Sequence, residues 1–423
     1  MILKKCNDSK NARPRVTLRA VPLLWLIALS AILAAPWFGK AANNIKPLSP
    51  DRGDILASPR EKAARSGKWG DLTLVPIVLS PPMELVSIEW GFKRQPTWFF
   101  PGMNEDRVVQ ALQSVGVSAT DAARLRAEAG SEPRIAGVVI KPDPSWVRSL
   151  TPETRARIYN MLPKGELNSD QTRPFKYPGS SLEDWLSPGL VSETMRRLVE
   201  PLIYRDGRYM VLSDIELIRS EIGSEDDLRR LAKALLRQPT VMARLSVGPT
   251  ADLNTLVEYW GRGGRRTKIR PLLESAAESG GNGFIDVIHL LPSFAQSHLY
   301  CYPTFSDAEL NNLALANCIW TSLNFFLPAP DNRFLDFNVA LKTLKEDYFI
   351  VKADFELGDI VAFLDGGGNV FHTAVYIADD LLFTKNGISA MAPWTLMSIE
   401  DVKDYYRSLS EKPVLLVHRR KSS

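Results

Sequence analysis

Cys318 and His372 stand in segments that could bring a thiol and an imidazole together. Cys318 follows Asn317 inside SDAELNNLALANCIWTSLNFFLP (306–328), a stretch whose pattern predicts a helix closed by Pro328. His372 lies near the start of VFHTAVYIA, a run of β-branched and aromatic residues that predicts a strand. A thiol is nucleophilic as its thiolate, and a neighbouring imidazole lowers its pKa. The two residues are therefore candidates for the nucleophile and base of a cysteine hydrolase.

A third polar residue would have to orient the imidazole. Thr384 and Asn386 lie in LLFTKNG, the next predicted strand, where alternation puts both side chains on one face. Asn386 is the preferred orienting residue, because its side-chain oxygen can accept the second ring N–H of His372, and Thr384 is the weaker candidate. Two alternatives stay open: Asn386 and Gly387 form only a turn, or Cys318 is a small buried hydrophobe and His372 is a surface histidine with its hydrogen bonds satisfied.

The other cysteines and histidines are weaker candidates. His289 and His298 precede Cys318 on apolar stretches and are interpreted as structural. A disulfide between Cys301 and Cys318 is a further alternative, and it would remove the nucleophile. Cys6 has no evident role. No two of the three cysteines have zinc-ligand spacing, so neither a metal nor another cofactor is expected.

The candidate residues lie in a predicted helix and in the three predicted strands that follow it. GDIVAFLD (358–365), residues 370–378 and residues 381–387 are predicted as strands, with turns at Gly366-Gly367-Gly368 and Asp379-Asp380. A helix that carries Cys318 would precede them. A helix followed by an antiparallel meander indicates an α+β fold.

Residues 300–395 resemble the NlpC-type cell-wall peptidases, papain-like cysteine enzymes that cleave peptidoglycan stem peptides or related amide and acyl bonds. NCIWTSLNFF, GDIVAF and HTAVYIADD stand where that family has its nucleophile helix, a Gly-Asp strand and a strand of the form H-x-x-x-Y-I. The resemblance implies a papain-like fold with Cys318 as nucleophile and His372 as base. The family's third residue stands twelve positions beyond the base, which is Thr384 here. Ile319-Trp320 replaces the family's Ser-Gly, so a standard stem-peptide groove is not implied.

The function predicted from these residues is hydrolysis of an amide or ester bond, or acyl transfer, on a peptide, acyl or cell-wall substrate. The backbone N–H of Cys318 is the predicted oxyanion donor. An alternative from another class is an exported binding or scaffold protein whose NlpC-like domain is inactive. A third is a membrane-anchored regulator that recognises anions through the basic loop within YWGRGGRRTKIRPLLES (259–275), although a solvated loop is favoured there.

The N-terminus predicts export. Residues 1–19 hold six basic side chains against Asp8, and residues 20–39 carry no charge. A basic segment before an apolar run is typical of a secretion signal, and the run is also long enough for a membrane anchor. The N-terminal segment is therefore expected to contact the membrane, and the body to be periplasmic or anchored to the inner membrane facing outward.

Length and composition predict several parts. The chain has 423 residues, more than one compact domain usually needs, and 45% hydrophobic residues exclude wholesale disorder. The net charge of +4 resides in the N-terminal segment, so no nucleic-acid partner is expected. The predicted division is a signal peptide or anchor (1–42), a linker (43–70), a mostly helical domain (71–290) and an NlpC-like hydrolase domain (291–423).

Within the predicted helical domain, LTLVPIVLS (72–80) and MELVSIEWGF (83–92) read as short strands. Helices are predicted in EDRVVQALQSVG, TDAARLRAEA and TPETRARIYNML, the last capped by Thr151, and in SEDDLRRLAKALLRQP (224–239), capped by Ser224. The aromatic residues Trp90, Phe92, Trp98, Phe99 and Phe100 are expected to belong to the core.

Overall fold

The structure is a computed structural model that describes residues 61–83, 86, 96–132, 136–162, 167–168, 171, 174–179, 181–278, 283–304, 315–389, 391–407 and 409–421. The predicted signal or anchor (1–42), most of the predicted linker, Cys6, Trp90 and Phe92 lie outside these residues. Among the helices in the described ranges, none combines the length and the apolar character that a membrane span requires.

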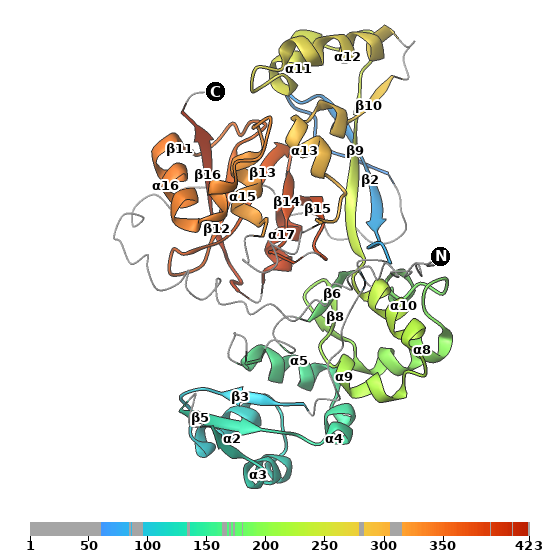
Figure 1. Ribbon diagram of the computed structural model, residues 1–423, viewed down its shortest axis with the longest axis vertical. Coiled ribbons are helices and arrows are strands. Elements are labelled where there is room, and N and C mark those ends of the chain that lie inside the picture. The colour runs from blue at the N-terminus through green and yellow to red at the C-terminus, as the bar shows by residue number, and fades with distance from the viewer. Residues whose placement is uncertain are drawn as a thin grey trace, which may run out of the picture.

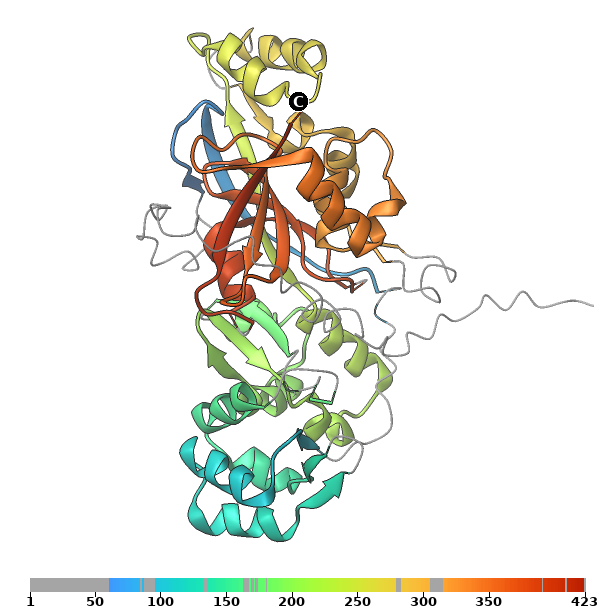
Figure 2. The same cartoon turned by 90° about the vertical axis from the view of Figure 1, so that its left-hand side faces the viewer.

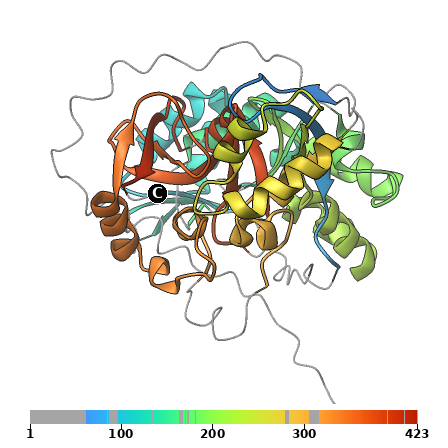
Figure 3. The same cartoon turned by 90° about the horizontal axis from the view of Figure 1, so that it is seen from above.

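The fold is α+β, as the sequence predicts, and the molecule is elongated (Figure 1). The helices α11 (Leu253–Trp260) and α12 (Arg266–Glu278) lie at one end, and a six-stranded sheet follows. At the other end is a small sheet with α2 (Glu105–Ser114) and α3 (Ala119–Ala127). Seen from above, these parts overlap because they follow one another along the long axis (Figure 3).

The C-terminal sheet is antiparallel throughout, with the strand order β11-β16-β12-β13-β14-β15. The three strands predicted between residues 358 and 387 are its central members. The bounds are β11 (Tyr348–Val351), β12 (Ile360–Leu364), β13 (Val370–Ala378), β14 (Leu381–Lys385), β15 (Trp394–Ser398) and β16 (Val414–Arg420).

Helices cover both faces of this sheet. On one face lie α15 (Cys318–Asn324) and α16 (Phe337–Asp347), and Ile319 and Leu323 of α15 pack against Ile360 of β12. These two helices are the orange ones to one side of the sheet in Figure 2. On the other face, α17 (Ile399–Tyr405) buries Val402 beside Ala374 of β13. The sheet therefore presents alternate residues of each strand to two separate apolar clusters.

The middle of the chain contains more strands than the sequence predicts. It holds two three-stranded sheets and one long strand, β9 (Gln238–Ser246), which pairs along its whole length with β2 (Asp71–Leu79). The predicted strand at 72–80 is thus confirmed, but the partner strand was missed. The short sheets are β3 (Trp98–Phe100), β5 (Gly137–Ile140) and β4 (Gly130–Glu132), and β6 (Phe175–Pro178), β8 (Tyr209–Leu212) and β7 (Tyr204–Asp206).

The predicted helices form where their caps and apolar spacing place them. Thr151 caps α5 (Pro152–Met161) by accepting the N–H of Thr154 at 3.2 Å, and Ser224 caps α10 (Glu225–Leu235) in the same way. The helix predicted over 224–239 ends at Leu235, because the following residues pair with β2. Trp98 and Phe100 are buried in the core, as predicted.

The long β2–β9 pair meets the C-terminal sheet at its edge strand. Thr240 donates its hydroxyl to the carbonyl oxygen of Leu396 in β15 at 2.7 Å and accepts the N–H of Leu396 at 3.0 Å. β1 (Lys62–Ala63) and β10 (Phe284–Asp286) complete this four-stranded sheet.

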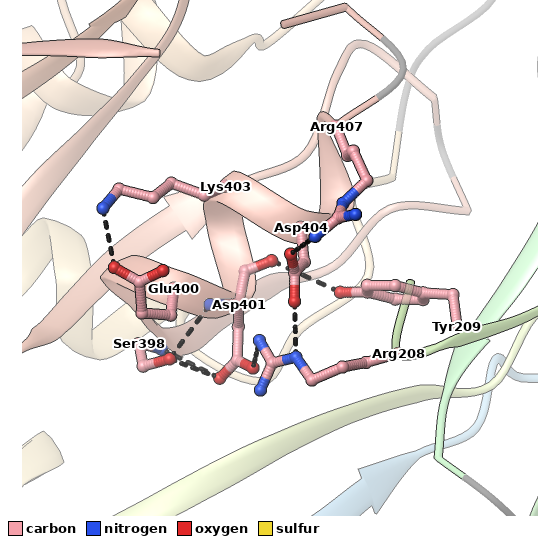
Figure 4. A network of polar contacts seen from close by, with 8 residues as sticks. All are labelled: Arg208, Tyr209, Ser398, Glu400, Asp401, Lys403, Asp404 and Arg407. Atoms are coloured by element: carbon pink, nitrogen blue, oxygen red, sulfur yellow. Dashed lines mark hydrogen bonds and ion pairs between the residues drawn. The ribbon is translucent and has the colours of Figure 1, made fainter. Parts of the chain in front are cut away.

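A polar network joins the turn between β7 and β8 to α17 (Figure 4). Arg208 lies 2.9 Å from Asp401 and also pairs with Asp404, while the hydroxyl of Tyr209 donates to the carbonyl oxygen of Asp401 at 3.3 Å. Asp401 also closes a capping box with Ser398 at the start of α17. The network therefore docks the middle of the chain against a helix of the C-terminal sheet.

Candidate active site

Cys318 is the first residue of α15, and Asn317 begins the helix by accepting the N–H of Trp320 at 2.9 Å. The helix packs on β13, where the hydroxyl of Ser322 lies 3.1 Å from that of Thr373. The hydroxyl and the backbone N–H of Thr373 lie close enough to the Cys318 thiol to lower its pKa. The thiol therefore faces the sheet at Thr373.

The surroundings of Cys318 act on its pKa in opposite directions. Burial of the thiol is the largest effect and raises the pKa, because the anion loses hydration. The hydrogen bonds from Thr373 and from the backbone N–H groups of Ile319 and Cys318 lower it. The net direction is upward, so the thiol is protonated at neutral pH unless another group takes its proton.

His372 projects to the opposite face of the sheet from α15. Because side chains alternate along β13, Thr373 on the α15 face places His372 on the α17 face. The ring of His372 lies 4.5 Å from that of Tyr406 and 5.7 Å from that of Phe363, centroid to centroid. Its Nδ1 has no hydrogen-bond partner in the described part of the chain. The structure therefore places the candidate nucleophile and the candidate base on opposite faces of the sheet.

Thr384, rather than Asn386, is the partner of His372. The His372 Nε2 lies 2.8 Å from the Thr384 hydroxyl, whereas the Asn386 amide nitrogen contacts the sulfur of Met397 at 3.2 Å. The preference for Asn386 as the orienting residue is thus corrected. His372 is fully buried, and burial lowers the pKa of its imidazole to about 3. The pair sits inside an apolar layer, so His372 is not the surface histidine that the sequence left open as an alternative.

Lys385 is a residue that the sequence analysis missed. It follows Thr384 in β14, so its side chain points to the α15 face, and it is fully buried. Its Nζ donates to the carbonyl oxygens of Gly387 at 2.9 Å and Ser389 at 3.0 Å and lies 5.6 Å from the centre of the Trp394 ring. Burial lowers the pKa of Lys385 to about 7, and the charge of Cys318 acts in the opposite direction. A lysine inside the strand predicted over residues 381–387 was the signal that could have found it.

The remaining candidates take other positions. Cys301 and Cys318 are both free thiols, so they form no disulfide. His298 donates its Nδ1–H to the carbonyl oxygen of Phe294 at 2.7 Å, and burial lowers the pKa of its imidazole. In the part of the chain that the structure describes, histidine, cysteine and acidic side chains form no group suited to a metal ion.

The arginines of the predicted basic loop are engaged within the chain. Arg262 pairs with Glu356, and Arg266 pairs with Glu258. Arg265 donates to three backbone carbonyl groups, those of residues 260, 262 and 290. These contacts use the positive charge to hold α11 and α12 in place, and they favour the structural interpretation of the loop over anion binding.

A cavity of about 310 Å³ lies beside α15. Ala316 and Trp320, two residues before and after Cys318, form part of its wall, and so does Trp394, whose ring adjoins Lys385. Cys318 itself is not among the lining residues. The volume is at the lower end of the roughly 300–1,000 Å³ of small-molecule sites. The other lining residues are Ser297, His298, Cys301, Tyr302, Pro303, Thr304, Asn332 and Leu335.

Comparison of the chain with protein-family models, with curated proteins and with solved structures found no match.

Proposed function

We propose that the C-terminal part of the chain is a cysteine hydrolase or acyltransferase that uses Cys318 to attack the carbonyl group of an amide or ester. One observation carries the proposal: the thiol of Cys318 lies among hydrogen-bond donors at the start of a helix that packs on an antiparallel sheet. This is the arrangement that the resemblance to NlpC-type peptidases implies. The donors of Thr373 and of the helix start favour the anionic sulfur that must form during attack.

The substrate class follows from the cavity. Trp320 and Trp394 provide apolar walls, while Asn332 and Thr304 provide polar groups. A peptide or acyl group with an amide or ester beside it combines these two properties. A carbonyl group held at the α15 end of the cavity would approach Cys318 past Ala316.

The cellular site is proposed from the N-terminal sequence. The basic segment and the uncharged run of residues 20–39 support export, with the N-terminal segment at the membrane. An exported thiol hydrolase would meet peptide or acyl bonds of the cell envelope, and cell-wall peptides are the substrates to try first.

A second function, an inactive binding or scaffold domain, is favoured by the position of His372. The predicted base is sealed in the core on the far face of the sheet, so a Cys–His pair is not formed. A scaffold would need no base. The two functions differ in whether Cys318 carries an acyl group during turnover.

An acylation experiment tests the proposed function. The full chain is mixed with p-nitrophenyl acetate, and we expect a burst of p-nitrophenol close to one equivalent, with the acetyl group on the peptide that contains Cys318. Cys318→Ala should remove the burst, and Cys301→Ser should keep it. An equal burst from Cys318→Ala, or a wild-type protein never acetylated at Cys318, would rule out the proposal in favour of the scaffold.

A further inference from the structure

We propose that Lys385 is the catalytic residue that accepts the proton of Cys318, in the role that the sequence assigned to His372. This inference rests on the proposed function, because it names the base of the same reaction. A lysine side chain is rarely found at a fully buried position of a strand. Lys385 is fully buried and forms no ion pair with an acidic side chain in the described residues.

The register of the sheet places Lys385 on the face that α15, the helix of Cys318, covers. β13 and β14 pair with Val375 opposite Phe383. Continued by two residues, this register sets Thr373 opposite Lys385, on the face that α15 covers. Thr373 contacts the Cys318 thiol, and the charge of Cys318 acts on Lys385.

A second contact ties Lys385 to the same helix. The Trp394 ring lies beneath the Lys385 Nζ, and the Trp394 Nε1 donates to the Thr321 hydroxyl of α15 at 3.0 Å. The lysine is thereby enclosed between β15 and the first turn of α15. Trp394 also lines the cavity proposed for the substrate.

The hydrogen bonds of Lys385 suit a neutral amine. A neutral amine has two N–H groups and one lone pair, whereas the ammonium has three N–H groups. The carbonyl oxygens of Gly387 and Ser389 accept two N–H groups. In the described part of the chain, Nζ makes no hydrogen bond beyond these two, so the third position is open to the lone pair.

The reaction then balances without any other group. As the Cys318 sulfur bonds to the carbonyl carbon, its proton passes to the lone pair of Lys385, and the carbonyl oxygen becomes an oxyanion. The oxyanion collapses, the bond to the leaving amine or alcohol breaks, and Lys385 returns the proton to that group. Water then attacks the thioester, giving a proton to Lys385, which passes it to the departing sulfur of Cys318.

The ionisable groups around Lys385 and Cys318 allow the Lys385 amine to accept a proton near neutral pH. Burial lowers the pKa of Lys385 to about 7, so the amine is mostly neutral above that pH. The charge of Cys318 also acts on Tyr406, whose pKa burial raises well above its ordinary value. His298 lies beyond the Trp394 ring, 4.6 Å from it, and burial lowers its pKa. Tyr406 and His298 are therefore uncharged at neutral pH.

The test is the pH profile of Cys318 alkylation by iodoacetamide, followed on the full chain by peptide mass spectrometry. In the wild type we expect the rate to rise through a midpoint near pH 7. In Lys385→Met the midpoint should move above the ordinary range of cysteine, and the rate at pH 7.5 should fall about tenfold or more. Lys403→Met, which removes a lysine from the surface of α17, should keep the wild-type profile. An unchanged profile in Lys385→Met would overturn the inference.

A measurement on the unmodified lysine covers the case in which Lys385→Met does not fold. Carbon-13 labelled lysine gives a titration curve for Lys385 by NMR, and we expect a midpoint near pH 7 that moves lower in Cys318→Ala. A lysine that stays charged to pH 10, or one that titrates identically in both proteins, would contradict the inference. Failure of Cys318→Ala to abolish acetylation would instead reject the proposed function, so the two failures are distinguishable.

Discussion

At the scale of single residues, His372 and Lys385 show how burial acts on two basic side chains of the same sheet. Both imidazole and amine lose hydration inside the protein, and the pKa of each falls, to about 3 for His372 and about 7 for Lys385. His372 contacts the Thr384 hydroxyl and two aromatic rings on the face of the sheet away from Cys318. It is therefore neutral at every pH at which the protein would work.

The buried histidine should make the free energy of unfolding depend on pH. Because the pKa of His372 is about 3 in the folded chain and about 6.5 in the unfolded chain, the unfolded chain alone binds a proton between those values. The free energy of unfolding should therefore fall by about 1.4 kcal/mol for each pH unit below 6.5 on account of His372. His372→Gln, which can still meet Thr384, should remove this slope, as urea unfolding at several pH values would show.

The exposed His289 provides the matched control. His289→Gln should keep the pH slope of the wild type. Buried Asp214, whose pKa burial raises to about 6, acts with the opposite sign, but it is common to all three proteins and cancels in the comparison. A wild-type protein and a His372→Gln variant with parallel curves from pH 7 to pH 4 would contradict the assignment of His372 to the core.

At the scale of elements, α17 links the two halves of the described chain. Its acidic residues Asp401 and Asp404 hold Arg208, which belongs to the turn between β7 and β8 (Figure 4). The same helix covers the face of the sheet on which His372 lies. The helix α17 therefore contacts both the C-terminal sheet and a turn that lies far away in the sequence.

Replacement of Arg208 tests this link. Its side chain is about one-third exposed, so Arg208→Ala should lower the free energy of unfolding by only about 1 kcal/mol, mostly through the lost pairs with Asp401 and Asp404. Amide hydrogen exchange in α17 should become faster. Arg197→Ala, which removes an exposed pair within one helix, should leave that exchange unchanged. Equal protection of α17 in both variants would show that the network does not hold the helix.

At the scale of the whole molecule, the described residues form an elongated body, and its strand β1 (Lys62–Ala63) lies within the predicted linker (Figure 1). The expectation of export depends on the sequence of the first 42 residues. A reporter enzyme fused after residue 60 should be active only on the periplasmic or outer side of the membrane, because the basic segment stays on the cytoplasmic side. Cytoplasmic activity of the reporter would contradict the proposal. In a separate experiment, a chain without residues 1–42 should remain folded and soluble.

Local signals in the sequence determined the elements that depend on near neighbours. The strand predicted over 370–378 forms with those bounds, because alternating apolar residues end at a turn at each side. Thr151 and Ser224 begin their helices, because a cap needs only a backbone N–H three residues away. The pattern placed Cys318 inside a helix, and the structure makes it the first residue of α15. The resemblance gave Thr384 the third position, and its hydroxyl lies 2.8 Å from the Nε2 of His372.

Long-range pairing determined the rest. β9 forms only because β2 lies beside it, and its residues carry no period strong enough to predict a strand alone. The site depended on the same kind of information. Alternation along β13 and β14 tells which residues share a face, so His372 separates from Thr373, and Thr384 separates from Lys385. Which face receives the helix of Cys318 is decided by packing of α15 against the whole sheet, and that choice put Lys385 on the face that α15 covers and His372 on the opposite face.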